Sequence, residues 1–327
     1  MRGMGHSIRG GRRRSLRCPL FQNFDCMHSS SVTTDDLDIA NLGPRKFSSP
    51  GWQRDFAAEG TGWNCDGDRI LLNDHMDAIR AAMKSGVEPP SIELAGPRGE
   101  IYFDPADTCC AIVTCGGLCP GINDVIRAIV MQAHYVYGVR RILGIQYGYE
   151  GLDPAFGHKP VELTPGKVDS ITSFGGSMLG TSRGKRNTKV MANRLEALGV
   201  NILFVIGGDG SQRGAKDIHE EMRQRGSQIA IVGVPKTIDN DVIPIKQSLG
   251  AWTAADEGAR YFWNVVSEHS AAPRMLIVHE VMGRNCGWLT AATARAYQAS
   301  LAGKSWVPGI GLAKERYGVH AIYIPEL

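Results

Sequence analysis

NILFVIGGDGSQRGA, at residues 201–215, is the clearest indication of the fold class in this chain. An unbroken apolar run leads through glycines straight into a helical pattern at 211–224. A strand that is apolar on both faces is typical of a parallel sheet covered by helices on both sides. The stretch therefore predicts a buried strand followed by a helix in an α/β fold.

The same alternation of strand and helix extends in both directions from this stretch. Apolar runs predict further strands at 109–115, 141–147, 229–235, 274–281 and 320–326. Helical patterns lie at 121–137, 187–198, 255–271 and 287–300. We expect a three-layer α/β fold with a mainly parallel sheet and helices on both faces. Ligands of such sheets bind beyond the carboxyl ends of the strands, so the loops that follow the strands are the candidate sites.

Composition excludes several classes of protein. Of the 327 residues, 43% are hydrophobic and 21% are charged, which excludes a disordered or collagen-like chain. No apolar run approaches the roughly 18 residues of a membrane span, so we expect a soluble protein without a membrane partner. The net charge of +3 is local, because residues 1–31 hold six arginines against the single acid Asp25. The remainder is slightly acidic, which argues against nucleic acid as a partner.

Three regions are expected along the chain. Residues 1–31 form either a basic tail or a targeting segment. A tail is expected of a cytoplasmic protein, which we favour, and a targeting segment would direct the protein to a plastid. Residues 32–107 form a Gly- and Pro-rich extension, and residues 108–327 form the core. Within the extension, the pattern at 72–86 predicts one helix, capped by Asn73 and ended by Gly86. The eight cysteines lack paired CxxC spacing, so neither a zinc ribbon nor a disulfide framework is indicated.

Two glycine-rich loops are candidate phosphate sites. TCGGLCPGIN at 114–123 follows a strand and opens a helix, where unpaired N–H groups favour an anion; a tight turn without a ligand is the alternative. GGDGS at 207–211 would let a polyphosphate lie on the backbone while Asp209 offers a hard oxygen to Mg²⁺. A plain turn could also use Asp-Gly at that place.

The segment GVPKTIDNDV at 233–242 is the most informative loop. It crowds Thr237, Asp239, Asn240 and Asp241 just past a predicted strand. Two carboxylates one residue apart suit a general base beside a metal or phosphate. The alternative, an Asx-turn that caps the next helix, would need only one of them.

Cationic side chains follow in two further segments. Arg284 comes directly after the predicted strand at 274–281, where it could clamp a phosphate or carboxylate; a surface arginine is the alternative. The segment at 174–187 groups Arg183, Lys185 and Arg186 in a glycine-rich loop. These loops offer phosphate-binding groups, a metal ligand and a general base, and no nucleophile elbow of the serine-hydrolase type follows a predicted strand. Together these features favour phosphoryl transfer.

In order and spacing, GGLCPGIN, GGSMLGTSRG, GGDGS, PKTIDND and MGR resemble the 6-phosphofructokinase family over about 108–327. The resemblance implies Mg²⁺-dependent transfer of the ATP γ-phosphoryl group to the 1-hydroxyl of fructose 6-phosphate, giving fructose 1,6-bisphosphate in glycolysis. Two alternatives remain: a pyrophosphate-dependent phosphotransferase, and an inactive nucleotide-binding or regulatory subunit. A NAD or lipid kinase could share GGDG but not PKTIDND and MGR.

The resemblance also implies roles for individual residues. Asp209 would hold Mg²⁺, and Asp239 would take the proton of the sugar hydroxyl. The catalytic set would be Asp239, Thr237, Asp241 and Arg284. The donor would be bound by Gly116, Arg183, Gly184, Gly208, Asp209, Gly210 and Ser211. The sugar phosphate would be bound by Thr237, Ile238, Asp239, Arg274, Met282, Gly283 and Arg284.

The identity of the donor depends on two positions. Residues 96–215 look like plant-type ATP-dependent enzymes, whereas residues 247–293 are similar to pyrophosphate-dependent bacterial ones. In the family, glycine at the position of Gly210 leaves space for a nucleotide, while lysine at the position of Lys236 accompanies pyrophosphate. Because plant-type enzymes resemble this sequence in combining the two, we expect ATP.

The resemblance finally concerns the end of the chain and its assembly. Family members continue beyond the position of Leu327 with a His-x-x-Arg-Gly-Gly segment that grips the sugar phosphate. We therefore expect a truncated chain whose second domain is incomplete. Family members form dimers or tetramers, so a homo-oligomer is expected.

Overall fold

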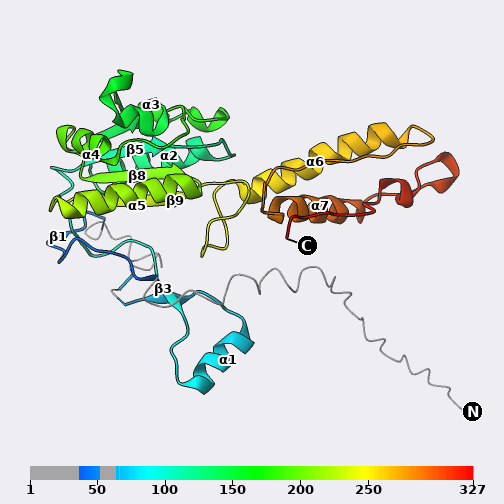
Figure 1. Cartoon of the computed structure of the whole chain (residues 1–327), viewed down its shortest axis with the longest axis horizontal. Coiled ribbons are helices and arrows are strands. Elements are labelled where there is room, and N and C mark those ends of the chain that lie inside the picture. The colour runs from blue at the N-terminus through cyan, green and yellow to red at the C-terminus, as the bar shows by residue number, and fades with distance from the viewer. Residues whose placement is uncertain (1–36, 52–63, 66, 327) are drawn as a thin grey trace, which may run out of the picture. The chain divides into compact units, whose positions relative to one another are not determined.

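The computed structural model describes residues 37–51, 64–65 and 67–326 (Figure 1). These residues fall into two compact units, of which the smaller contains 37–38 and 69–93 and the larger contains the rest. The predicted basic tail at 1–31 lies outside the described residues. In the part of the chain that is described, no helix is long and apolar enough to cross a membrane.

A five-stranded sheet forms the centre of the larger unit. Its spatial order is β7-β6-β5-β8-β9. The strands are β5 (Cys109–Thr114), β6 (Arg141–Ile145), β7 (Val161–Glu162), β8 (Ile202–Gly207) and β9 (Ala230–Pro235). Four of them are parallel, as predicted, and only the two-residue β7 pairs antiparallel, with β6.

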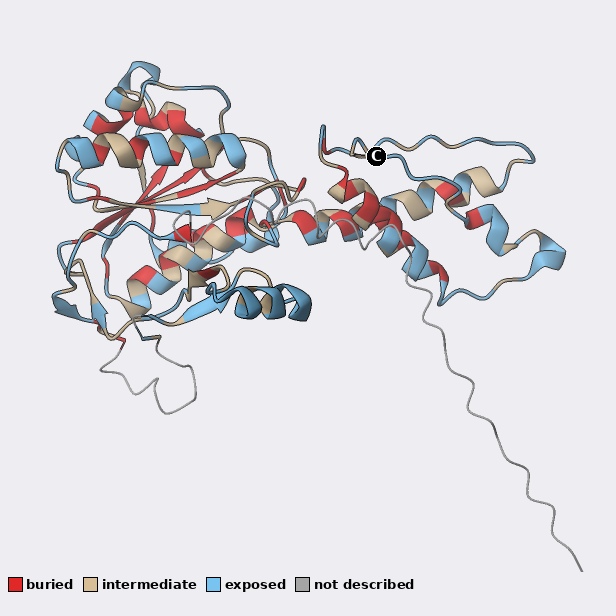
Figure 2. Ribbon diagram, turned by 60° about the horizontal axis from the view of Figure 1, so that its bottom comes forward, coloured by how far each residue is buried: buried red, intermediate tan, exposed pale blue. Residues whose placement is uncertain are grey.

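Helices cover both faces of this sheet, which confirms the three-layer prediction. On one face lie α2 (Ile122–Met131) and α3 (Pro165–Val168), and on the other α4 (Thr188–Ala197) and α5 (Asp209–Gln224). Successive residues of β5 alternate between the layers: Ala111 and Val113 pack with α4 and α5, whereas Cys110 and Ile112 pack with α2. Figure 2 shows buried residues along the sheet and exposed residues on the outer helix faces.

Shorter helical turns complete this unit. A π-helical turn at Gln132–Val136 continues α2. The 3₁₀ turns are Gly148–Leu152, Pro154–Phe156, Ile171–Ser173, Pro308–Ile310 and Lys314–Tyr317.

Two further helices pair with each other around a separate apolar cluster. They are α6 (Ala251–Ser270) and α7 (Trp288–Leu301). Tyr297 is fully buried in this cluster, and its hydroxyl donates to the backbone oxygen of Tyr317 at 2.8 Å. The predicted helices at 255–271 and 287–300 are confirmed, although α6 begins four residues earlier, directly after Gly250.

The strands predicted at 274–281 and 320–326 are wrong. Both segments lack regular secondary structure, and Leu276 and Val278 are each 86% exposed. A strand exists only where a neighbouring strand accepts its backbone hydrogen bonds. Among the described residues no strand pairs with either segment, so their apolar composition alone does not produce a strand.

The smaller unit contains a strand pair and one helix. Strand β2 (Arg69–Leu71) pairs antiparallel with β3 (Ser91–Glu93), and α1 (Met76–Ser85) lies between them in sequence. Asn73 does not cap α1: its side chain accepts from His75 N at 2.9 Å, which forms a turn before the helix. Gly86 ends α1 in a left-handed conformation, as predicted.

A second short strand pair belongs to the larger unit. There β1 (Phe47–Ser48) pairs antiparallel with β4 (Glu100–Ile101). Both strands fall in the predicted extension at 32–107, whose residues are therefore divided between the two units.

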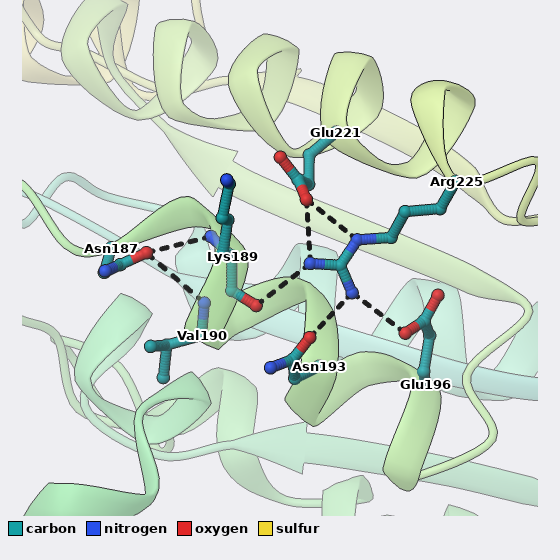
Figure 3. A network of polar contacts seen from close by, with 7 residues as sticks. All are labelled: Asn187, Lys189, Val190, Asn193, Glu196, Glu221 and Arg225. Atoms are coloured by element: carbon teal, nitrogen blue, oxygen red, sulfur yellow. Dashed lines mark hydrogen bonds and ion pairs between the residues drawn. The ribbon is translucent and has the colours of Figure 1, made fainter.

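One arginine joins α4 to the end of α5 (Figure 3). The guanidinium of Arg225 donates to Glu221 at 2.8 Å from Nε and to Asn193 at 2.7 Å. It also reaches Glu196 at 3.0 Å and the backbone oxygen of Lys189 at 3.4 Å. Because a planar guanidinium satisfies several acceptors at once, this network holds two helices in register on the sheet.

We expect Arg225→Met to lower the midpoint of thermal unfolding, because Glu221 and Glu196 lose their shared counter-charge while the apolar stem is kept. Arg223→Met, two residues earlier in the last turn of α5, is the matched control, since Arg223 is exposed and has no ion pair among the described residues. Differential scanning fluorimetry of both variants checks this. Equal midpoints would show that the network adds nothing to stability.

Candidate active site

Three loops begin side by side at the carboxyl edge of the sheet. Cys115 N donates to Ile206 O at 2.9 Å, and Lys236 N donates to Gly207 O at 3.0 Å. These bonds join the ends of β5 and β9 to the end of β8. The loops that start after residues 114, 207 and 235 therefore leave the sheet next to one another.

The first loop contacts the segment that carries Arg183. Gly116 adopts a left-handed conformation, and its N–H donates to Ser182 O at 3.1 Å while its carbonyl accepts from Thr181 Oγ1 at 2.7 Å. A Cβ atom at Gly116 would lie 3.7 Å from Ser211 Oγ, and one at Gly117 would lie 3.4 Å from an Arg183 nitrogen. The predicted donor residues Gly116, Arg183 and Ser211 are thus brought together.

The second loop is the start of α5. Gly208 precedes the helix, and its carbonyl accepts from Ser211 N and Gln212 N, both at 2.9 Å. Asp209 stands at the helix N-terminus with its side chain 50% exposed and paired with Arg213. A Cβ atom on Gly210 would meet nothing within 4 Å. This end of the helix is therefore open, and its N–H groups suit an anion.

A buried lysine joins the third loop to the first. Lys236 is only 3% exposed, and its ammonium donates to Gly117 O. Burial lowers the pKa of Lys236, and the charge of Arg183 acts in the same direction. A Cβ atom on Gly208 would lie 3.4 Å from Lys236 O, so the second loop also lies against this residue.

Asp239 is the buried carboxylate of the site. Its side chain is 12% exposed, and its N–H donates to Thr237 Oγ1 at 3.1 Å. Arg284 approaches to 3.9 Å from Asp239 Oδ2. Burial and the charge of Asp241 raise the pKa of Asp239, and Arg284 partly offsets them. A carboxylate with a raised pKa is better matched to proton transfer near neutral pH.

Asn240 fixes the shape of this loop. It has φ +54°, a conformation that asparagine tolerates better than most residues. Its side-chain oxygen accepts from Ser248 N at 2.7 Å, and its amide donates to Lys246 O at 3.1 Å. These bonds tie the middle of the loop, between Asp239 and Asp241, to residues 246–248.

The MGR segment forms a tight turn beside Asp239. Gly283 has φ +147°, and a Cβ atom there would overlap Cys286 O. Arg284 has φ +53° and an 86% exposed side chain. Cys286 Sγ lies 3.3 Å from Asp239 O and donates to it. The turn is thereby attached to the backbone of the candidate base.

The remaining predicted residues lie in different surroundings. Ile238 packs against the apolar layer that contains α2. Gly184 has φ +101° in the loop after Arg183, and Met282 is exposed. Arg274 is exposed, and among the described residues no hydrogen bond or ion pair joins it to the other candidates.

Sequence reasoning missed four residues at this edge of the fold. Arg213 pairs with Asp209, and its spacing of four residues on a helix could have revealed it. Cys286 reaches Asp239 only through the turn, and Glu326 accepts from Gly287 N at 2.7 Å at the start of α7. Gln212 bonds to both β8 and β9. No pattern in the sequence reports these last three contacts.

Comparison with known proteins points to one family. The family model described as Phosphofructokinase matches residues 109–304. The chain is 44% identical over 234 residues to a pyrophosphate–fructose 6-phosphate 1-phosphotransferase of Methylomonas methanica, covering 66% of this chain and 57% of the relative. It is 38% identical over 271 residues to an ATP-dependent 6-phosphofructokinase of Trypanosoma cruzi, covering 82% and 55%.

A solved structure shows the same architecture. Phosphofructokinase from Saccharomyces cerevisiae aligns with a TM-score of 0.51 at 31% identity, covering 58% of this chain and 28% of that one. The chain spans about half the length of the curated relatives it matches. Since the family model covers more than half of the chain, the chain belongs to the phosphofructokinase family.

Proposed function

We propose that this chain carries the phosphoryl-transfer site of a 6-phosphofructokinase, which moves the γ-phosphoryl group of ATP to the 1-hydroxyl of fructose 6-phosphate. The observation that carries the proposal is Asp239. This carboxylate is buried, has a raised pKa and faces Arg284, one loop away from the open N-terminus of α5. A base and an anion site side by side suit phosphoryl transfer.

The donor would lie on the backbone of the first two loops. Gly116 and the residues 208–211 offer N–H groups and little side-chain bulk, and the positive end of the α5 dipole favours phosphate. Arg183 and Gly184 would complete the set of residues that bind the phosphoryl donor. The cation of Arg183 would offset charge on the transferred oxygens.

Asp209 is the residue that would hold Mg²⁺. Within the described residues no cluster of three or more His, Cys, Asp or Glu could hold a metal by itself. Mg²⁺ in kinase sites is bound by one or two carboxylates together with substrate phosphates, and the half-exposed Asp209 fits that donor set. The ion would neutralise charge on the phosphates.

The acceptor would lie against the third loop and the MGR turn. Asp239 would accept the proton of the 1-hydroxyl as its oxygen attacks the phosphorus, with Thr237 and Asp241 lining the pocket. Arg284 would hold the sugar phosphate while limiting the rise in the pKa of Asp239. Ile238, Met282 and Gly283 would contact the sugar, and Arg274 would bind its phosphate.

Pyrophosphate is the second candidate donor. The observation that favours it is the fixed ammonium of Lys236 beside the first loop, together with the name of the Methylomonas methanica relative. The open space at Gly210 favours ATP, because a nucleotide needs room beyond its β-phosphate.

The direct test supplies the purified chain with Mg²⁺, fructose 6-phosphate and either ATP or pyrophosphate, and measures fructose 1,6-bisphosphate. We expect product with ATP, and a loss of kcat by roughly 10²- to 10⁴-fold in Asp239→Asn, because the amide cannot take the proton. Nucleotide binding without product in the wild-type chain would contradict a catalyst and would instead indicate a nucleotide-binding subunit.

Two substitutions should move the pH dependence in opposite directions. Arg284 lowers the pKa of Asp239, so Arg284→Gln should shift the acidic limb of the kcat/KM profile to higher pH. Asp241 raises that pKa, so Asp241→Asn should shift the limb to lower pH. Activity must fall as the pH drops through the pKa, since only the ionised carboxylate is a base. Shifts in the same direction would exclude Asp239 as the titrating group.

Gly210→Asp should abolish the use of ATP, because its carboxylate would fill and repel the space assigned to the nucleotide. The position tolerates a side chain, since a Cβ atom there meets nothing within 4 Å, so the variant should fold. Gly210→Ala is the matched control and should keep most ATP-dependent activity. Unchanged ATP kinetics in the aspartate variant would refute the assignment.

A further inference from the structure

The side-chain amide of Gln212 lies between the carboxyl ends of two strands. Its Nε2 atom is 2.8 Å from Gly207 O and 3.3 Å from Val205 O, both on β8. It is also 3.2 Å from Val234 O on β9. A glutamine amide has two N–H donors, so the three carbonyls share two protons, and one side chain is bonded to both strands.

Gly233 leaves the space that this amide occupies. A Cβ atom on Gly233 would overlap Gln212 Oε1. The φ angle of Gly233 is not in the left-handed region, so its backbone conformation does not call for glycine. A methyl group at position 233 would have to displace the amide of Gln212, so the two residues form a matched pair.

The two strand ends bonded by Gln212 lead into the two halves of the proposed site. Gly207 is followed by the donor residues 208–211, and Val234 is followed by Lys236 and the acceptor loop to Asp241. Gly207 O already accepts a hydrogen bond from Lys236 N at 3.0 Å, so the side-chain amide of Gln212 gives the same carbonyl a second hydrogen bond. Gln212 itself stands in the first turn of α5, beside Asp209.

We propose that Gln212 is a positioning residue that sets the separation between the donor loop and the acceptor loop, acting through Gly207 and Val234. The inference rests on the proposed function of those loops. Phosphoryl transfer needs the attacking oxygen and the phosphorus in line, and a misplacement of about 1 Å can cost roughly 100-fold in rate. Gln212 is not among the residues assigned to either ligand, so we expect each ligand to bind alone without it.

The test compares Gln212→Met with the wild-type full chain. Methionine keeps the length and apolar stem of the side chain but has no N–H donor. We expect kcat to fall by about 10-fold or more, while the separate Kd values for Mg²⁺-ATP and fructose 6-phosphate stay within about twofold. Lys216→Met, an exposed position one turn further along α5, is the control and should match the wild type.

A readout without turnover separates this proposal from the proposed function. The backbone N–H of Lys236 is hydrogen-bonded to Gly207 O, and its exchange with solvent hydrogen should become faster by about 10-fold in Gln212→Met. If the wild-type chain forms no product, the proposed reaction fails, and faster exchange still supports the tie between the loops. Unchanged exchange at Lys236 overturns it.

The pair with Gly233 provides a double-mutant cycle. Gly233→Ala should lower kcat and speed Lys236 exchange in the wild-type background, because the methyl group displaces the amide. In a Gln212→Ala background the same change should add little, since the space is empty. Additive effects would overturn the coupling. Equal losses of kcat and of both affinities, in step with a lower unfolding midpoint, would assign Gln212 to stability alone.

Discussion

The hydrogen bonds between neighbouring strand ends are the constraint on which the candidate active site depends. Cys115 N bonds to Ile206 O, and Lys236 N bonds to Gly207 O, so three loops start from one fixed edge. In a parallel sheet all the carboxyl ends lie at the same edge, and loops distant in sequence meet there. Apolar layers pack α2 and α5 against the sheet from which these loops start.

Burial shifts the pKa values of Lys236 and Asp239, both in the third loop, in opposite directions. Burial lowers the pKa of Lys236 and raises the pKa of Asp239, because in each case it disfavours the charged form. Lys236 is compensated by the Gly117 carbonyl, and Asp239 by the nearby Arg284. A carboxylate left only partly compensated is a better base, so incomplete neutralisation of Asp239 serves the proposed reaction.

The sides of the site that we propose for the donor and for the acceptor are built differently. The donor side is assembled from backbone contacts between loops that follow β5 and β8, with Gly116 and Ser211 facing each other. On the acceptor side, the MGR turn lies against Asp239. Arg284 in this turn is largely exposed, and Cys286 Sγ donates to the backbone oxygen of Asp239. The donor side is therefore set by the sheet, and the acceptor side by the turn that precedes α7.

Apolar periodicity and the positions of glycine were enough to predict the parallel strands of the central sheet, the helices that follow them and the loops that carry Asp209 and Asp239, because periodicity reports burial and glycine reports tight turns. The family resemblance grouped Arg284 with Asp239 in one catalytic set. Two features could be found only in the folded chain: residues 274–281 do not form a strand, and Gln212 joins β8 to β9. A hydrogen bond between distant residues depends on which segments become neighbours and in which register, and local composition contains neither.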